Sequence, residues 1–154
     1  MILVDLPGHG RSALPAGRDT QAALRLALRG FLLASAPMTA VGALVARTVF
    51  PRPEQAALRE AAAARVAGTS RRSYLAAASA IAGFDARVWL GDVRCPVMVV
   101  AGIDDRTVDI DAKHALARAI AGARLVLVAG SGHVTNVDQP VAFNAVLREF
   151  LAAC

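Results

Sequence analysis

The sequence predicts an α/β fold built on a parallel sheet of about four strands flanked by helices. Short apolar runs end in loops of glycine and polar residues, and stretches with helical spacing separate them. These runs lie at residues 2–6, 31–35, 95–102 and 124–128. Strands that alternate with helices along a chain favour right-handed β-α-β units and a parallel sheet. A length of 154 residues fits one domain, residues 1–154.

The helices between these runs are expected from capping residues and from proline and glycine at their ends. Pro53 marks the start of a segment that Gly68 closes, and Ser70 is a candidate N-cap for the next helix. The run at 95–102 is rich in β-branched residues, so we expect a strand buried on both faces, with Cys95 as a core thiol. The expected helices are residues 20–29, 54–66, 72–82, 111–121 and 140–152.

The composition excludes two broad classes of protein. Hydrophobic residues make up 56% of the chain and charged residues 19%, whereas disordered chains combine low hydrophobicity with high charge. Two cysteines, Cys95 and Cys154, are too few for a disulfide scaffold. The chain is therefore expected to fold around an apolar core.

The basic charge balance does not predict a nucleic-acid partner. The net charge is +5, but the arginines are scattered singly apart from Arg71 and Arg72, and no aromatic residues alternate with them. The uncharged stretch 30–46 is short for a membrane span and contains Pro37. We therefore expect no membrane partner. No basic segment precedes the first apolar residues, so we expect no signal peptide and a location in the reducing cytoplasm.

Polar and titratable side chains follow three of the predicted strands. They lie at residues 8–12, 104–106 and 131–133. Ligand and catalytic sites in open parallel sheets form in loops at the carboxyl ends of strands. Asp105 and His133 follow adjacent strands, so the carboxylate can orient the imidazole and leave its other nitrogen free as a base. The alternative is a structural aspartate in a turn and a loop histidine with no catalytic role.

Two other kinds of site fit the sequence less well. Gly8, Gly10 and Ala13 match a dinucleotide-binding fingerprint, but Pro15 and Gly17 interrupt the helix that this motif requires. The histidines and cysteines lack the spacing of metal ligands. We therefore expect neither a metal nor an organic cofactor.

Three segments of the sequence resemble the α/β-hydrolase superfamily. Residues 4–12 (VDLPGHGRS) resemble the loop after the family's fourth strand. Residues 90–105 (LGDVRCPVMVVAGIDD) resemble its seventh strand with the catalytic acid. Residues 130–133 (GSGH), with Asp138 to Pro140 and Phe143 after them, resemble the catalytic histidine loop and the final helix. The nearest branch is that of the esterases, haloperoxidase-like enzymes and carbon–carbon-bond hydrolases.

This resemblance implies a partial α/β-hydrolase core in which residues 38–89 form a helical cap-like insertion. It also implies hydrolysis of an ester-like small molecule by acyl transfer, with His133 as the base and Asp105 as the acid. The family's nucleophile stands in a G-x-S-x-G pentapeptide, and the sequence contains none. Ser12, Ser35 and Ser131 are the candidate substitutes.

Two expectations follow from the absence of that pentapeptide. Without a nucleophile the chain is expected to be inactive or severely impaired alone, and the alternative is a non-catalytic module that binds a small molecule or a protein. Without the intervening strands of the family sheet, residues 2–6 are expected to pair in parallel with residues 31–35. Exposed sheet edges would favour a homodimer.

Overall fold

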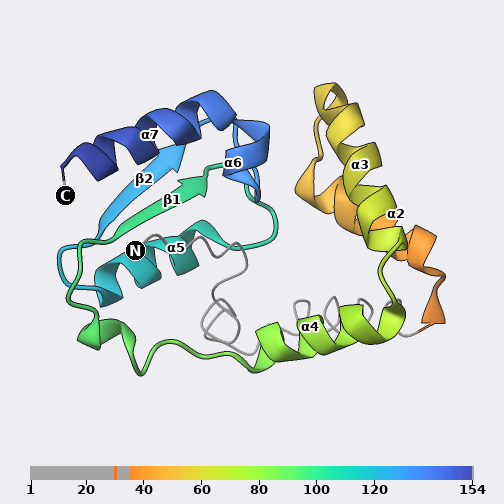
Figure 1. The fold of residues 1–154 in the computed structure, drawn as a ribbon, viewed down its shortest axis with the longest axis horizontal. Coiled ribbons are helices and arrows are strands. Elements are labelled where there is room, and N and C mark those ends of the chain that lie inside the picture. The colour runs from red at the N-terminus through yellow and green to blue at the C-terminus, as the bar shows by residue number, and fades with distance from the viewer. Residues whose placement is uncertain (1–29, 31–34, 154) are drawn as a thin grey trace. The chain divides into compact units, whose positions relative to one another are not determined.

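The computed structural model describes residue 30 and residues 35–153, which fall into two compact units. One unit contains residues 84–153, and the other contains the described residues up to Gly83. The predicted insertion at 38–89 crosses the boundary between them, and its role as a cap stays a prediction. Figure 1 shows the elements of each unit.

The unit of residues 84–153 is built on two parallel strands. β1 (Met98–Gly102) pairs in parallel with β2 (Arg124–Val128), with Met98 opposite Arg124 and Gly102 opposite Val128. α5 (Ile110–Ala119) connects the two strands and lies on one side of them, and α7 (Pro140–Ala152) lies on the other (Figure 1). The short helices η3 (Leu90–Asp92) and α6 (Thr135–Asp138) complete the unit. This is the β-α-β arrangement that the sequence predicts.

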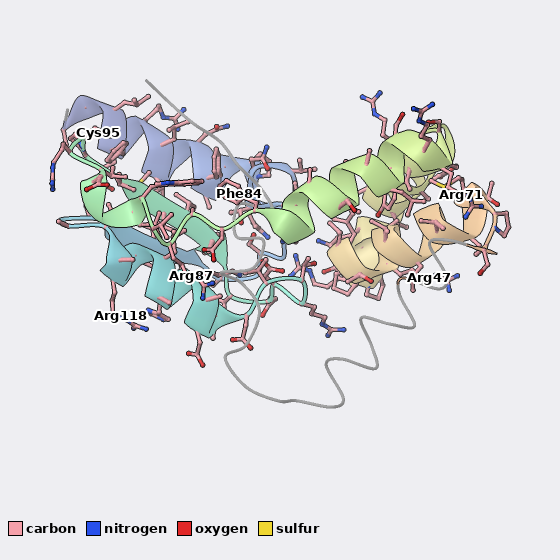
Figure 2. All side chains as sticks on the ribbon, turned by 90° about the horizontal axis from the view of Figure 1, so that it is seen from below. Arg47, Arg71, Phe84, Arg87, Cys95 and Arg118 are labelled. Carbon is pink, nitrogen blue, oxygen red and sulfur yellow. The ribbon has the colours of Figure 1, made fainter. Side chains whose placement is uncertain are left out.

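The observed ends of the elements match the predicted ends most closely where proline or polar residues mark them. β2 and α7 have the predicted bounds. β1 begins only at Met98, two residues after Pro96, which has no N–H to donate to a neighbouring strand. Cys95 therefore lies before the strand and is exposed (Figure 2), so its prediction as a core thiol is wrong.

Burial in β1 increases toward its carboxyl end. The first three residues are half-buried, and only Ala101 and Gly102 are buried, so the expected burial along the whole strand is wrong among the described residues. Val108, Ile120 and Val128 are the other buried apolar residues of this unit. Ala101, Val108 and Val128 thus lie near the carboxyl ends of the strands, where the polar loops begin, and Ile120 lies just before the start of β2.

The second unit is helical in its described part. α2 (Met38–Val49) packs on α3 (Ala56–Ala67), and η2 (Pro53–Gln55) and α4 (Arg71–Gly83) complete it. A Cβ atom at Gly42 would overlap with the carbonyl oxygen of Ala63, so glycine permits the close approach of α2 and α3. The predicted helices at 54–66 and 72–82 are present within one or two residues at each end.

Several predictions fall outside the described residues. They are the strand at 2–6, its pairing with 31–35, the helix at 20–29, and the loop that contains Ser12. Of the predicted strand 31–35 only Ser35 is described, and its backbone is helical. Within the described ranges, no helix has the length and apolar character needed to cross a membrane.

Candidate active site

Asp105 and His133 are in direct contact at the carboxyl ends of β1 and β2. Nδ1 of His133 lies 3.0 Å from Oδ2 of Asp105, and the two side chains are 12% and 4% exposed. A carboxylate at this distance favours the tautomer with its proton on Nδ1, which leaves Nε2 as an acceptor. The structure thus joins the two residues that the sequence placed after neighbouring strands.

The two loops that carry this pair are joined through their backbones. Ile103 N–H donates to the carbonyl of Val128 at 3.1 Å, and Asp104 N–H donates to the carbonyl of Ser131 at 2.9 Å. The parallel pairing of β1 and β2 therefore continues into the loops. At Gly102 the loops approach so closely that a Cβ atom would overlap with the carbonyl oxygens of Ser131 and Gly132.

The other carboxylate oxygen of Asp105 organises its own loop. Oδ1 accepts hydrogen bonds from the backbone N–H groups of Thr107 at 2.7 Å and Val108 at 3.2 Å. An aspartate side chain that accepts a hydrogen bond from the backbone two residues later forms a local turn. Because Val108 is buried in the core, this turn anchors the acid loop to the body of the unit.

A third residue, Lys113, completes the buried cluster. Its Nζ lies 2.8 Å from Oδ2 of Asp105 and 3.1 Å from the carbonyl oxygen of Gly102, and the side chain is 6% exposed. Sequence reasoning missed this residue. The available signal was its type, because Lys113 is the single lysine among the 17 lysine and arginine residues of the chain.

The surroundings of Asp105 hold its carboxyl group in the ionised form. Burial alone would raise its pKa, but hydrogen bonds from His133, Lys113 and the Thr107 backbone, together with the charge of His133, outweigh burial. The net effect lowers the pKa of Asp105 well below its ordinary value of 3.8. Asp105 is therefore a carboxylate throughout the physiological pH range and can stabilise an imidazolium on His133.

This lowered pKa predicts how stability depends on pH. The folded protein releases the Asp105 proton more readily than the unfolded chain, so the group stabilises the fold above its ordinary pKa. That contribution is lost as the pH falls through the ordinary value toward the folded one. We expect the difference in unfolding free energy between the wild type and Asp105→Asn to shrink below about pH 4. Urea unfolding at several pH values measures it, and parallel pH curves for the two proteins would contradict the assignment.

The histidine loop is held by residues that follow it in the chain. Ser131 Oγ donates to Oδ1 of Asp138 at 2.8 Å, and Gly132 N–H donates to Oδ2 of the same carboxylate at 2.6 Å. Gly130 has a φ of 66°, which favours glycine, and its carbonyl accepts from Nε2 of Gln139 at 2.9 Å. The Asp138–Gln139 pair thus fixes the turn that presents His133.

These contacts bear on the candidate nucleophiles. Ser131 has no exposed surface, and its hydroxyl is bonded to Asp138, so a substrate cannot reach it in this structure. Ser35 lies in the helical unit, and Ser12 lies outside the described residues. The described site therefore brings together an acid, a base and a lysine.

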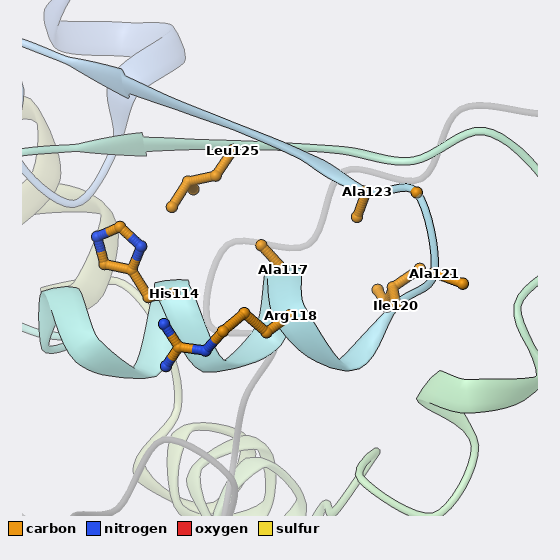
Figure 3. A pocket seen from close by; sticks show the side chains of 8 residues that line it. His114, Ala117, Arg118, Ile120, Ala121, Ala123 and Leu125 are labelled. Atoms are coloured by element: carbon orange, nitrogen blue, oxygen red, sulfur yellow. The ribbon is translucent and has the colours of Figure 1, made fainter.

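Other kinds of site are not evident beside this cluster. Among the described residues, no three histidine, cysteine, aspartate or glutamate side chains are grouped to hold a metal. A shallow cavity of about 400 Å³ lies between α5 and β2, lined by His114, Arg118 and Leu125 among others (Figure 3). Neither Asp105 nor His133 lines that cavity.

Solved structures with a similar fold include several hydrolases. The enol-lactonase of Burkholderia xenovorans LB400 matches 82% of this chain and 49% of its own, with a TM-score of 0.74 and 23% identity. A hydrolase of Pseudomonas aeruginosa PA01 matches 88% of this chain and 51% of its own, with a TM-score of 0.71 and 27% identity. The chain carries part of an α/β-hydrolase fold. The predicted fold class and the predicted resemblance are thereby confirmed.

Part of the chain also matches curated relatives in sequence. RutD of Pseudomonas savastanoi pv. phaseolicola is provisionally named as a carbamate hydrolase. It is 35% identical to this chain over 74 residues. That alignment covers 48% of this chain and 29% of the relative. A comparison with models of protein families finds no match. The chain thus spans about half the length of the solved structures and under a third of the length of this relative.

Proposed function

We propose that this α/β-hydrolase chain supplies the acid and base of an ester-type hydrolytic site. The observation that carries the proposal is the 3.0 Å contact between His133 Nδ1 and Asp105 Oδ2 at the carboxyl ends of paired strands. Its substrate would be a small ester-like molecule, in keeping with similar proteins that are named as an enol-lactonase and, provisionally, as a carbamate hydrolase. The location proposed for this activity is the cytoplasm.

In this proposal Nε2 of His133 is the general base. It removes a proton from the attacking oxygen as that oxygen forms a bond to the ester carbonyl carbon. The proton then passes from the imidazolium to the leaving alcohol oxygen as the carbon–oxygen bond breaks. Asp105 keeps the ring in the productive tautomer and stabilises its charge between the two proton transfers.

The attacking oxygen is the weak point of the site. The sequence contains no G-x-S-x-G pentapeptide, and Ser131 is buried against Asp138. With water in place of an activated serine, turnover would fall by on the order of a millionfold. The chain alone is therefore proposed to be a severely impaired hydrolase. The competing function, a non-catalytic binding module, does not require an aspartate–histidine contact.

Ester hydrolysis by the purified chain tests the base. We expect His133→Ala and Asp105→Asn to lower the residual rate of p-nitrophenyl acetate hydrolysis by about a hundredfold, because each removes general-base catalysis. His114→Ala is the matched control, since this histidine lies on α5 and lines the separate cavity. Its rate should equal that of the wild type.

Intact-mass analysis after treatment with a fluorophosphonate probe tests the missing nucleophile. No adduct is expected on the folded chain. An adduct that disappears in His133→Ala would show that a serine is activated, and the proposed impairment would be wrong. Equal hydrolysis rates for the wild type and His133→Ala would instead contradict the role of the base.

A further inference from the structure

Lys113 lies in the candidate active site with no role in the acid–base scheme. It stands on the second turn of α5, a helix whose N-cap Asp109 accepts from the N–H of Asp111 at 3.0 Å. Its side chain is 6% exposed and ends against Asp105. Burying an ammonium group is costly, and an apolar side chain of similar volume often serves stability as well. Its presence therefore calls for a reason other than packing.

One oxygen of Asp105 receives two side-chain donors. Lys113 Nζ lies 2.8 Å from Oδ2, and His133 Nδ1 lies 3.0 Å from the same atom. Lys113 also donates to the carbonyl of Gly102 at 3.1 Å, so its ammonium is fixed to the end of β1. Oδ1 is occupied by the backbone of Thr107 and Val108. Rotation of the carboxylate would break bonds at both oxygens.

We propose that Lys113 is a positioning residue, whose ammonium holds the Asp105 carboxylate in the ionised, oriented state that pairs with Nδ1 of His133. The inference rests on the proposed function, in which His133 is the base. Lys113 itself does not touch the reacting atoms. It acts through Asp105, and its hydrogen bond to the Gly102 carbonyl keeps its ammonium group in place.

Two charged side chains of the described residues contact the Asp105 carboxylate. From α5 the carboxylate is faced by Lys113, and from the loop after β2 it is faced by His133. Asp104 and Arg106, its neighbours in the acid loop, are both exposed. Without Lys113, the partners of this carboxylate among residues 35–153 would be His133 and two backbone N–H groups. Protonation of Asp105 would then begin at a higher pH and release the imidazole.

The titration of the Asp105 carboxyl carbon, followed by carbon-13 NMR, tests this role. In Lys113→Met we expect the titration midpoint to rise by about one pH unit or more, because a neighbouring positive charge has been removed. We also expect the Nδ1–H proton of His133 to exchange with water several-fold faster at neutral pH. Lys113→Gln keeps a hydrogen-bond donor without the charge, and its midpoint should rise by less.

Arg118→Gln is the matched control. This residue lies on the same helix, is exposed and lines the cavity that contains neither Asp105 nor His133, so neither signal should change. An unchanged Asp105 midpoint in a folded Lys113→Met or Lys113→Gln protein would overturn the proposal. Loss of the fold in both variants would also overturn it, since Lys113 would then serve stability rather than orientation.

The NMR signals do not depend on turnover, so the two proposals can fail separately. If the Asp105 titration depends on Lys113 but ester hydrolysis does not depend on His133, the proposed function is wrong and the role of Lys113 stands. His133-dependent hydrolysis with an unchanged titration in the lysine variants would leave the function and remove the role of Lys113.

Discussion

Replacing Gly102 by alanine is expected to separate the acid loop from the histidine loop. The added Cβ would overlap with the carbonyl oxygens of Ser131 and Gly132, which are backbone atoms and cannot turn aside as a side chain can. Overpacking of this kind costs about 3 kcal/mol of unfolding free energy. The hydrogen bond from Asp104 N–H to the Ser131 carbonyl must also lengthen. We expect the contact between Asp105 and His133 to be lost with it.

Urea unfolding measures the stability of Gly102→Ala, and the Nδ1–H proton signal of His133 reports the contact. Gly91→Ala is the control, because a Cβ at Gly91 meets no atom within 4 Å and the residue belongs to the same unit. It should leave both measurements close to those of the wild type. A Gly102→Ala protein with wild-type stability and an intact Nδ1–H signal would show that the loops can move apart without cost.

The candidate acid and base could be predicted from the sequence because their position follows from the fold. A β-α-β unit brings the carboxyl ends of two consecutive strands together, and each strand is marked by a short apolar run. Asp105 and His133 stand shortly after those runs, so their proximity needs only the correct strand order. β2 and α7 were predicted with their observed bounds for the same reason: polar residues or proline mark their ends.

The other residues of the site could not be predicted, because their roles depend on contacts in the folded structure that residue spacing does not reveal. In the sequence, Lys113 looks like an ordinary polar residue on a helix. Its burial results from the packing of α5 against β1. The role of Gly102 depends on a loop 29 residues later in the chain. The sequence makes Ser131 a candidate nucleophile because it stands next to His133 in the same loop, but in the structure its hydroxyl donates to Asp138 in the following helix.

Burial was predicted less well than position. The apolar run at 95–102 suggested a strand buried on both faces, whereas its first three paired residues are half-buried and Cys95 is exposed. Hydrophobicity shows that a segment can be buried, but the neighbours that cover it decide how far it is. Only the end of β1 beside the histidine loop has such neighbours among the described residues.

Removing the carboxylate of Asp105 is expected to destabilise the protein more than removing an exposed charge would. In Asp105→Ala the buried Lys113 ammonium keeps the Gly102 carbonyl as its one remaining polar partner in the described part of the chain. Breaking one side of a buried ion pair in this way costs about 3–5 kcal/mol. The exposed pair of Arg124 and Glu149, 3.0 Å apart, gives the comparison. Glu149→Gln should cost less than about 1 kcal/mol.

A second substitution separates the buried charge from the lost packing. If the unpaired ammonium causes most of the loss, Asp105→Ala combined with Lys113→Met should be more stable than Asp105→Ala alone, because no charge is left buried. Urea unfolding at neutral pH measures the four proteins of this double-mutant cycle. Losses that simply add would mean that the two side chains stabilise the fold independently. Recovery in the double variant would show that Lys113 is tolerated in the core only because Asp105 faces it.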